Sequence, residues 1–138
     1  MRKSLFMIKP DAVSKNLIGP IISAVESAGF RIVAMKMLRL STGEAGEFYA
    51  VHRGKPFYNG LVDFISSGRI VVAVVEGEGG VERLREVVGA TDPAKAAEGT
   101  IRRAFAEDIQ RNAVHASDSD ENAIKEIEFF FSRRELLG

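Results

Sequence analysis

An unbroken apolar run, Ile70–Val75, does most to limit the folds open to this chain. Its sequence, IVVAVV, is rich in β-branched residues and shows no alternation between apolar and polar positions. Such a pattern is typical of a strand that is buried on both faces of a sheet. We therefore expect a sheet covered by helices, with Ile70–Val75 as a central strand.

The other apolar patterns predict three more strands and five helices. Apolar residues at helical spacing, followed by Gly29, mark one helix and its end. Ser41 with Glu44 is the signature of a capping box that opens another helix. The further strands are expected at Ser4–Ile8, Arg31–Leu40 and Asn112–Ala116, and the helices at Ile18–Ala28, Ser41–Val51, Asn59–Ser67, Val81–Val88 and Ser119–Phe130.

The order of these elements indicates an α/β or α+β layer, because strands alternate with helices along the chain. The βαββαβ order, with an extra helical pair after the second strand, favours a ferredoxin-like, four-stranded antiparallel sheet covered by helices. A mixed sheet with flavodoxin-like winding is the alternative. Residues 89–110 show no clear core pattern, and a loop of that length in a compact domain is usually functional.

Composition restricts the function and the location. The 138 residues suffice for one domain, which we expect to span residues 1–138. The formal net charge is zero, so neither a membrane nor a specific nucleic acid is an expected partner. The chain has no cysteine, and the apolar stretch that ends at Lys9 is shorter than the ~7 residues a signal peptide needs. We expect a cytoplasmic protein.

The strongest local motif surrounds His115, in the segment NAVHASD at residues 112–118. The imidazole is expected at a strand end, between small residues that leave it accessible. Glu126, in the following helix, is placed to fold back beside the ring. A carboxylate on one imidazole nitrogen fixes the tautomer and leaves the other nitrogen as a nucleophile or base. Taken alone, His115 could equally complete a polar network, and both interpretations stay open.

Cations near the long loop give a second signal. Arg85 lies near a predicted helix end, Arg102 lies within the loop, and Thr91 adds a hydroxyl. Guanidinium groups bind phosphate oxygens bidentately, and phosphoryl transfer depends mainly on positioning and charge neutralisation. For each arginine taken singly, a solvated surface position is the alternative.

Two further positions suit a nucleotide site. Lys9 lies at the carboxyl end of the first strand, where Pro10 stops the pairing and where ligands often bind. Phe57 follows a proline turn and could stack on a base. A solvated lysine and a core phenylalanine are the alternatives, and His52 is interpreted as structural. The sequence has no GxxxxGK[ST], GxGxxG or HExxH motif, so phosphate chemistry would rest on side-chain cations and on a metal carried by the substrate.

Taken together, these motifs resemble the nucleoside diphosphate kinase family over nearly the whole chain. The segment at residues 112–118 looks like the active-site signature of that family. Other matches, in the order and approximate spacing of the family, are Lys9-Pro10-Asp11, Gly29-Phe30, Tyr49, His52, Pro56-Phe57, Ser67-Gly68, Arg85, Gly89, Thr91-Asp92-Pro93, Gly99-Thr100-Ile101-Arg102 and Glu126.

The resemblance implies a ping-pong transfer of the γ-phosphate from a nucleoside triphosphate, typically ATP, to a nucleoside diphosphate. His115 would carry the phosphate, Glu126 would orient its ring, and Ser117 would lie nearby. The other implied roles concern the nucleotide: Arg85, Thr91 and Arg102 at the phosphates, Tyr49 beside the transferred group, Lys9 and Asn112 at the sugar 3′-hydroxyl, and Phe57 on the base. Stacking without hydrogen-bonded readout predicts broad tolerance of bases and of both sugars. Mg²⁺ would enter on the nucleotide phosphates.

The resemblance also implies a ferredoxin-like core and a homo-oligomer, either a tetramer or a hexamer. Two positions depart from the family pattern: Ala116 replaces a more usual glycine, and Glu98 replaces a common proline before Gly99. Two alternative functions are an RNA-recognition module and an inactive assembly scaffold. The absence of aromatics from Ile70–Val75 counts against the first, and the full set of site residues counts against the second.

Overall fold

The structure, a computed structural model, describes residues 2–136. Their strands are β1 (Arg2–Ile8), β2 (Arg31–Leu38), β3 (Ile70–Gly77) and β4 (Val114–Ala116). The α-helices are α1 (Pro10–Ser14), α2 (Ile18–Ser27), α3 (Thr42–Phe48), α4 (Tyr58–Ile65), α5 (Gly80–Val88), α6 (Ile101–Phe105) and α7 (Asp120–Phe130). Short 3₁₀ helices lie at η1 (Ala50–His52), η2 (Pro93–Lys95) and η3 (Arg134–Leu136).

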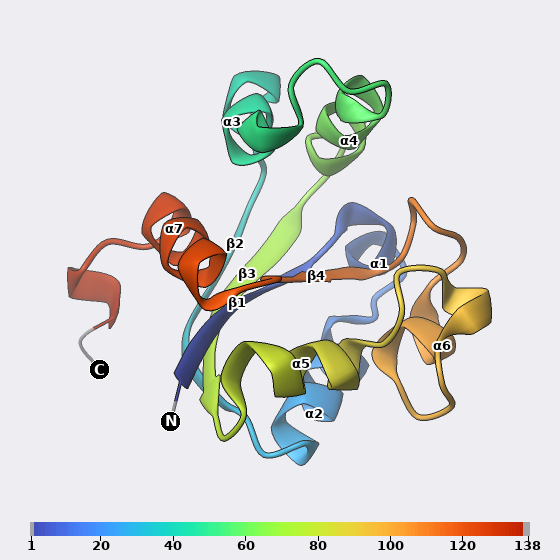
Figure 1. The fold of residues 1–138 in the computed structure, drawn as a ribbon, viewed down its shortest axis with the longest axis vertical. Helices are drawn as coiled ribbons and strands as arrows, with labels where there is room; N and C mark the ends of the chain where they lie inside the picture. Colours follow the sequence, from blue (N-terminus) through green and yellow to red (C-terminus); the bar gives the residue numbers. More distant parts are fainter. Residues whose placement is uncertain (1, 137–138) are drawn as a thin grey trace.

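The four strands form an antiparallel sheet in the order β2-β3-β1-β4 (Figure 1). In the register of β1, Leu5 lies opposite Val74 on one side and Met7 lies opposite His115 on the other. This order and pairing confirm the ferredoxin-like prediction. The flavodoxin-like alternative is wrong, because such a fold needs parallel strands and every strand pair in residues 2–136 is antiparallel.

Helices cover both faces of the sheet, and the core is divided accordingly (Figure 1). Phe6 and Ala73 belong to a cluster with residues of α2 and α5 on one face. Leu5 and Val74 belong to a second cluster, with residues of α3, α4 and α7 on the other face. Strand β3 is buried along nearly its whole length, as the apolar run Ile70–Val75 predicted.

Several short elements do not follow from the sequence patterns. Pro10 does end the pairing of β1, but it also begins α1, where the fixed φ of proline suits the first turn. The segment expected to be a loop at residues 89–110 contains η2 and α6, and Ile101 of α6 is almost fully buried. The predicted strands at 31–40 and 112–116 are each two residues shorter, as β2 and β4. None of the helices within residues 2–136 could cross a membrane.

Candidate active site

A cleft of about 1060 Å³ opens between the α3–α4 pair, α7, the end of β4 and the segment before β4. Nearly all of the site residues predicted from the sequence line it: Lys9, Tyr49, Phe57, Arg85, Thr91, Arg102, Asn112, His115 and Glu126. The remaining one, Ser117, is fully buried behind the cleft wall. The fold therefore brings together residues that lie far apart in the sequence.

His115 lies on β4, and one of its two ring nitrogens contacts a carboxylate. Its Nε2 lies 2.9 Å from Oε1 of Glu126, which projects from α7. The same carboxylate oxygen accepts a hydrogen bond of 2.7 Å from the Ser117 hydroxyl. A proton on Nε2 satisfies this contact, and the tautomer so fixed leaves the lone pair on Nδ1. The side chain of His115 is 21% exposed, enough for a ligand to reach the ring.

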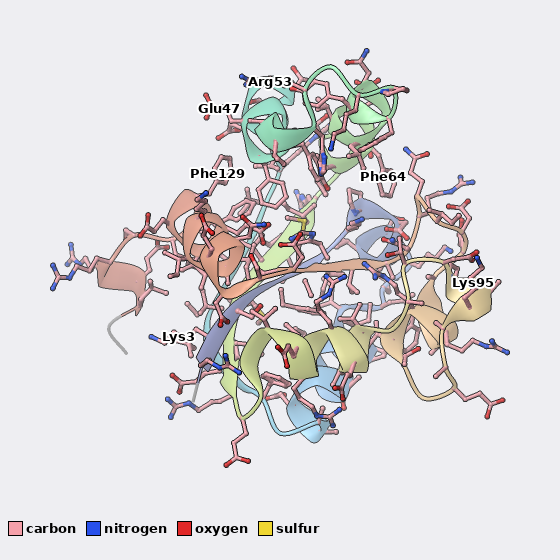
Figure 2. The ribbon with its side chains drawn as sticks, viewed as in Figure 1. Lys3, Glu47, Arg53, Phe64, Lys95 and Phe129 are labelled. Atoms are coloured by element: carbon pink, nitrogen blue, oxygen red, sulfur yellow. The ribbon has the colours of Figure 1, made fainter. Side chains whose placement is uncertain are left out.

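Aromatic side chains pack beside the His115 ring. Phe48 packs edge-to-face on the His115 ring, with ring centroids 5.5 Å apart, and also contacts Phe129 of α7. Figure 2 shows Phe129 directed from α7 toward α3, the helix that carries Glu47. Tyr49 is buried next to Phe48, and both burial and the negative charge of Glu126 raise the pKa of its hydroxyl. Tyr49 is therefore a neutral hydrogen-bonding group at neutral pH.

Arg102 is buried at the base of the cleft, although it carries a positive charge. Its guanidinium donates to the backbone carbonyls of Gly89, at 3.1 Å, and Val114, at 2.9 Å. Burial and the neighbouring Arg85 lower its pKa to about 10, so the group remains charged at neutral pH. These two bonds use two of the five N–H donors of the guanidinium, and its buried Nε has no hydrogen-bond partner.

Arg85 extends from the last turn of α5 and is exposed to solvent. It donates to the carbonyl of Ala116 at 3.3 Å, so its guanidinium lies beside the strand that carries His115. Asp118 also lines the cleft, and its pKa is lowered by a hydrogen bond from Asn122 and by the charge of Arg85. Two guanidinium groups thus face one cleft: that of Arg102 is buried and bonded to two carbonyls, and that of Arg85 is exposed and bonded to one.

Lys9 and Asn112 form a buried polar pair. The Lys9 ammonium donates to Oδ1 of Asn112 at 2.9 Å. Burial, with a further contribution from Arg102, lowers the pKa of Lys9 to about 8, and Asp11 opposes this shift. The Asn112 amide in turn donates to the carbonyl of Thr91 at 3.4 Å, which links the pair to the segment before α6.

Phe57 lies at the far end of the cleft and is 50% exposed, so it is not the core residue that the sequence left as an alternative. The exposed Ile109 lines the same cleft from the segment before β4. Gln110, the next residue, donates to the carbonyl of Gly60 on α4 at 3.2 Å. An aromatic face and an aliphatic side chain thus border one end of the cleft, while cations gather at the other.

Some cleft residues could not be recognised from the sequence. Phe48 and Phe129 occur at spacings that also fit core positions, and nothing in the sequence separates the two uses. His52 is interpreted as structural from the sequence, yet it lines the cleft with its ring 5.2 Å from that of Phe57. Asp118 had a weak signal, because it belongs to the motif around His115.

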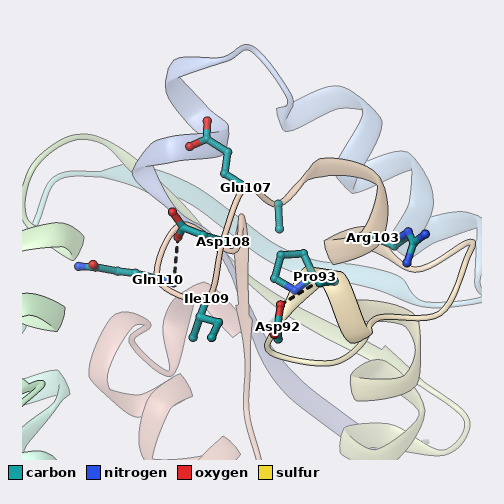
Figure 3. A pocket seen from close by; sticks show the side chains of 9 residues that line it. Asp92, Pro93, Arg103, Glu107, Asp108, Ile109 and Gln110 are labelled. Carbon is teal, nitrogen blue, oxygen red and sulfur yellow. Dashed lines mark hydrogen bonds between the residues drawn. The ribbon is translucent and has the colours of Figure 1, made fainter.

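A second, more open hollow lies on the other side of the segment before β4 (Figure 3). Figure 3 shows Asp108 and Gln110 joined there by a hydrogen bond, with Asp92 and Pro93 opposite. None of the predicted site residues lines this hollow. Within residues 2–136, histidine, aspartate and glutamate side chains do not gather in a group of three or more that could hold a metal ion.

The family model described as nucleoside diphosphate kinase matches residues 2–136. The chain belongs to the nucleoside diphosphate kinase family. A nucleoside diphosphate kinase of a Nitratiruptor species is 57% identical over 137 residues, covering 99% of this chain and 100% of the relative. A nucleoside diphosphate kinase of Chlamydia felis is 56% identical over 138 residues, covering 100% and 98%.

Solved structures of nucleoside diphosphate kinases share the fold. The Aquifex aeolicus enzyme superposes with a TM-score of 0.96 at 46% identity, over 99% of each chain. A halophilic enzyme of Halobacterium salinarum in complex with CDP gives a TM-score of 0.94 at 39% identity, over 99% of this chain and 91% of that one. As a nucleoside diphosphate kinase, the chain is an enzyme of nucleotide phosphate transfer.

Proposed function

We propose that the chain transfers the γ-phosphate of a nucleoside triphosphate to a nucleoside diphosphate by a ping-pong route, with a phosphohistidine on His115. The observation that supports this most is the contact of 2.9 Å between Nε2 of His115 and Glu126. It directs the free lone pair of an accessible ring to Nδ1 and leaves a proton on Nε2.

In the first half-reaction, Nδ1 of His115 attacks the γ-phosphorus. The Nδ1–P bond forms, the bond from phosphorus to the β,γ-bridging oxygen breaks, and the diphosphate leaves with the electron pair. The Nε2 proton stays in place, and Glu126 stabilises the positive charge that develops on the ring. In the second half-reaction, a β-phosphate oxygen of another diphosphate attacks the phosphorus, and the N–P bond breaks.

The cleft provides the positive charge that this transfer requires. Arg85 and Arg102 would bind phosphate oxygens, with the Thr91 hydroxyl beside them, and Tyr49 would donate to the transferred group. Lys9 and Asn112 would contact the sugar 3′-hydroxyl through the polar pair they already form. Mg²⁺ would enter as part of the substrate, bound to the nucleotide phosphates.

Base tolerance follows from Phe57. Its half-exposed ring offers a stacking surface, and stacking is available to every base because each has a π face. Transfer should therefore extend to all common bases and to both ribose and deoxyribose.

We also propose a cytoplasmic homo-oligomer, either a tetramer or a hexamer. The Mg²⁺-bound nucleotides that it would use are cytoplasmic metabolites. Strand β2 lies at a sheet edge, and its Met35 and Met37 are 50% and 47% exposed, so a second copy could cover this edge. Light scattering with size-exclusion chromatography measures the assembly, and a monomer at micromolar concentration would contradict it.

The proposal is tested by transfer from Mg²⁺-ATP to GDP and to dTDP, together with labelling of the protein by γ-labelled ATP. We expect transfer to both acceptors and one acid-labile, base-stable label per chain. His115→Ala should abolish both. His52→Ala is the matched control, because His52 is the second of only two histidines in the chain and lines the same cleft.

The outcomes separate the competing interpretations. If His52→Ala still takes the label and His115→Ala does not, the phosphate resides on His115. If a folded, nucleotide-binding wild type transfers nothing, the phosphohistidine route is wrong for this chain. Retention of full turnover by His115→Ala would exclude His115 as the carrier.

A further inference from the structure

Ala113, two residues before His115, has a backbone conformation that alanine rarely adopts. Its φ is 73°, and the N–H of Val114 donates to the carbonyl of Asn112 at 2.9 Å. A bond between residues two apart around a positive φ defines the rare and strained form of the γ-turn. Strain of this kind persists only where the surrounding structure holds it, and it is common at functional sites.

The segment after β1 holds this turn at both backbone groups of Ala113. The N–H of Lys9 donates to the carbonyl of Ala113 at 2.8 Å. The N–H of Ala113 donates to Oδ2 of Asp11 at 3.0 Å. Asp11 is buried, and its other oxygen, Oδ1, has no hydrogen-bond partner. A buried carboxylate oxygen without a partner is costly, and the nearby charge of Lys9 offsets part of that cost.

The two residues beside Ala113 lead to different parts of the site: Asn112 lines the cleft, whereas Val114 is buried in the core. Asn112 precedes the turn and meets the Lys9 ammonium, whereas Val114 follows it and leads into His115 on β4. A change in φ at Ala113 would move the Asn112 side chain relative to the His115 ring. The turn therefore sets the distance between the sugar contacts and the nucleophile.

We propose that Asp11 is a positioning residue that acts through the Ala113 amide, so that a nucleotide bound by Asn112 presents its phosphate to His115. This inference rests on the proposed function, because it uses the roles given there to Asn112 and His115. Asp11 itself does not line the cleft, so it would act on the nucleotide only through the Ala113 turn.

The test compares transfer from ATP to dTDP with transfer to its 3′-deoxy analogue. Asp11→Ala should lower kcat/KM for dTDP by roughly 100-fold, the order expected when a reacting group is misplaced by about 1 Å. Its activity with the 3′-deoxy acceptor should fall much less, because that acceptor cannot use Asn112. A merely structural role would lower both activities by the same factor.

Further variants test whether Asp11 acts through the Ala113 amide. Asp11→Asn keeps a side-chain oxygen for the Ala113 amide and should retain the preference for the 3′-hydroxyl. Asp11→Ala with Ala113→Gly should recover part of the loss, since glycine accepts a positive φ without strain. Asp63→Ala, an exposed aspartate on α4 outside the cleft, is the matched control and should behave as the wild type.

Folding is followed by circular dichroism for every variant. If Asp11→Ala does not fold, Asp11→Ser replaces it, because the serine oxygen is one bond too short to reach the amide. An unchanged acceptor preference in a folded variant would overturn the inference, and so would loss of the preference in Asp11→Asn. Failure of the wild type to transfer phosphate would instead refute the proposed function.

Discussion

One carboxylate oxygen of Glu126 joins His115 and Ser117: it lies 2.9 Å from Nε2 of the histidine and accepts the serine hydroxyl at 2.7 Å. The Ser117 hydroxyl is fixed in turn, because Leu5 N–H donates to it at 3.3 Å from β1. The orientation of the ring is thus tied to the central sheet and does not depend on α7 alone.

Replacement of Glu126 should slow formation of the phosphohistidine more than it weakens nucleotide binding. Glu126→Ala removes the acceptor for the Nε2 proton, and the rate should fall by roughly 100-fold or more, the typical contribution of a positioned acid–base partner. Glu126→Gln keeps an oxygen beside Nε2 and should lose less. Rapid-quench labelling with γ-labelled ATP measures the rate directly.

Glu128, two residues further along α7 and exposed, provides the control for charge on that helix. Glu128→Ala should label at the wild-type rate. Equal rates for Glu126→Ala and Glu128→Ala would show that the ring does not depend on the carboxylate.

Removal of the Phe57 ring should weaken binding of every nucleotide to a similar degree. Loss of one base–aromatic stack costs about 1–3 kcal/mol, so KM should rise roughly 5- to 150-fold with kcat little changed at saturation. Phe57→Trp should retain stacking. The comparison uses ATP, GTP, CTP and TTP, with Ile124→Ala, 59% exposed on α7 and outside the cleft, as the control. A selective loss for one base would indicate hydrogen-bonded readout instead.

Replacement by lysine should have different effects at Arg85 and at Arg102. Arg102→Lys loses bonds to the carbonyls of Gly89 and Val114, and an unsatisfied buried group costs roughly 1–3 kcal/mol of stability. Arg85 is exposed, so Arg85→Lys should raise the KM for ATP and change stability by no more than about 0.5 kcal/mol. Urea unfolding and steady-state kinetics on both variants decide this. Equal destabilisation by the two variants would contradict the structural role of the buried Arg102.

Much of the fold was predictable because its signals are periodic. The apolar run of β3 identified a strand buried on both faces, and the alternation of strands with helices identified the ferredoxin-like layer. The α-helices that were missed, α1 and α6, have five residues each, too few for a helical period to show. They depend on local capping and tertiary contact, such as the bond from Arg103 N–H to the Thr100 hydroxyl that opens α6.

The site was predictable where chemistry requires particular residue types, as with His115 and Glu126. The site was not predictable where the backbone conformation or the position of a side chain in the fold determines the role of a residue. Nothing in the residue type of Ala113 indicates a positive φ, because alanine avoids that conformation unless other groups hold it. Nor does the sequence distinguish the cleft-lining Phe48 from a core phenylalanine, since the same helix face serves both.

The buried ammonium of Lys9 should give the enzyme an alkaline limit. Its pKa in the folded protein is about 8, so the free enzyme loses this charge as the pH rises through 8, and kcat/KM should fall there. Bound polyphosphate favours the charged form, so the corresponding fall in kcat should lie at higher pH. Lys9→Met should have low activity, and its kcat/KM should not fall near pH 8. The same fall in that variant would show that another group titrates there.

The same ionisation should affect the free energy of unfolding, which should rise with pH where kcat/KM falls. The pKa of Lys9 is lowered from 10.5 to about 8 by folding, so between these values the unfolded chain binds more protons. The free energy of unfolding must therefore increase from pH 8 to 10.5. Burial of the charged ammonium costs about 3 kcal/mol below pH 8, and this cost disappears once Lys9 is neutral in both the folded and the unfolded chain. Urea unfolding of the wild type and Lys9→Met across this range isolates the effect. The wild type should gain stability relative to the variant, whereas a constant difference would mean that the ammonium is charged and compensated in the fold.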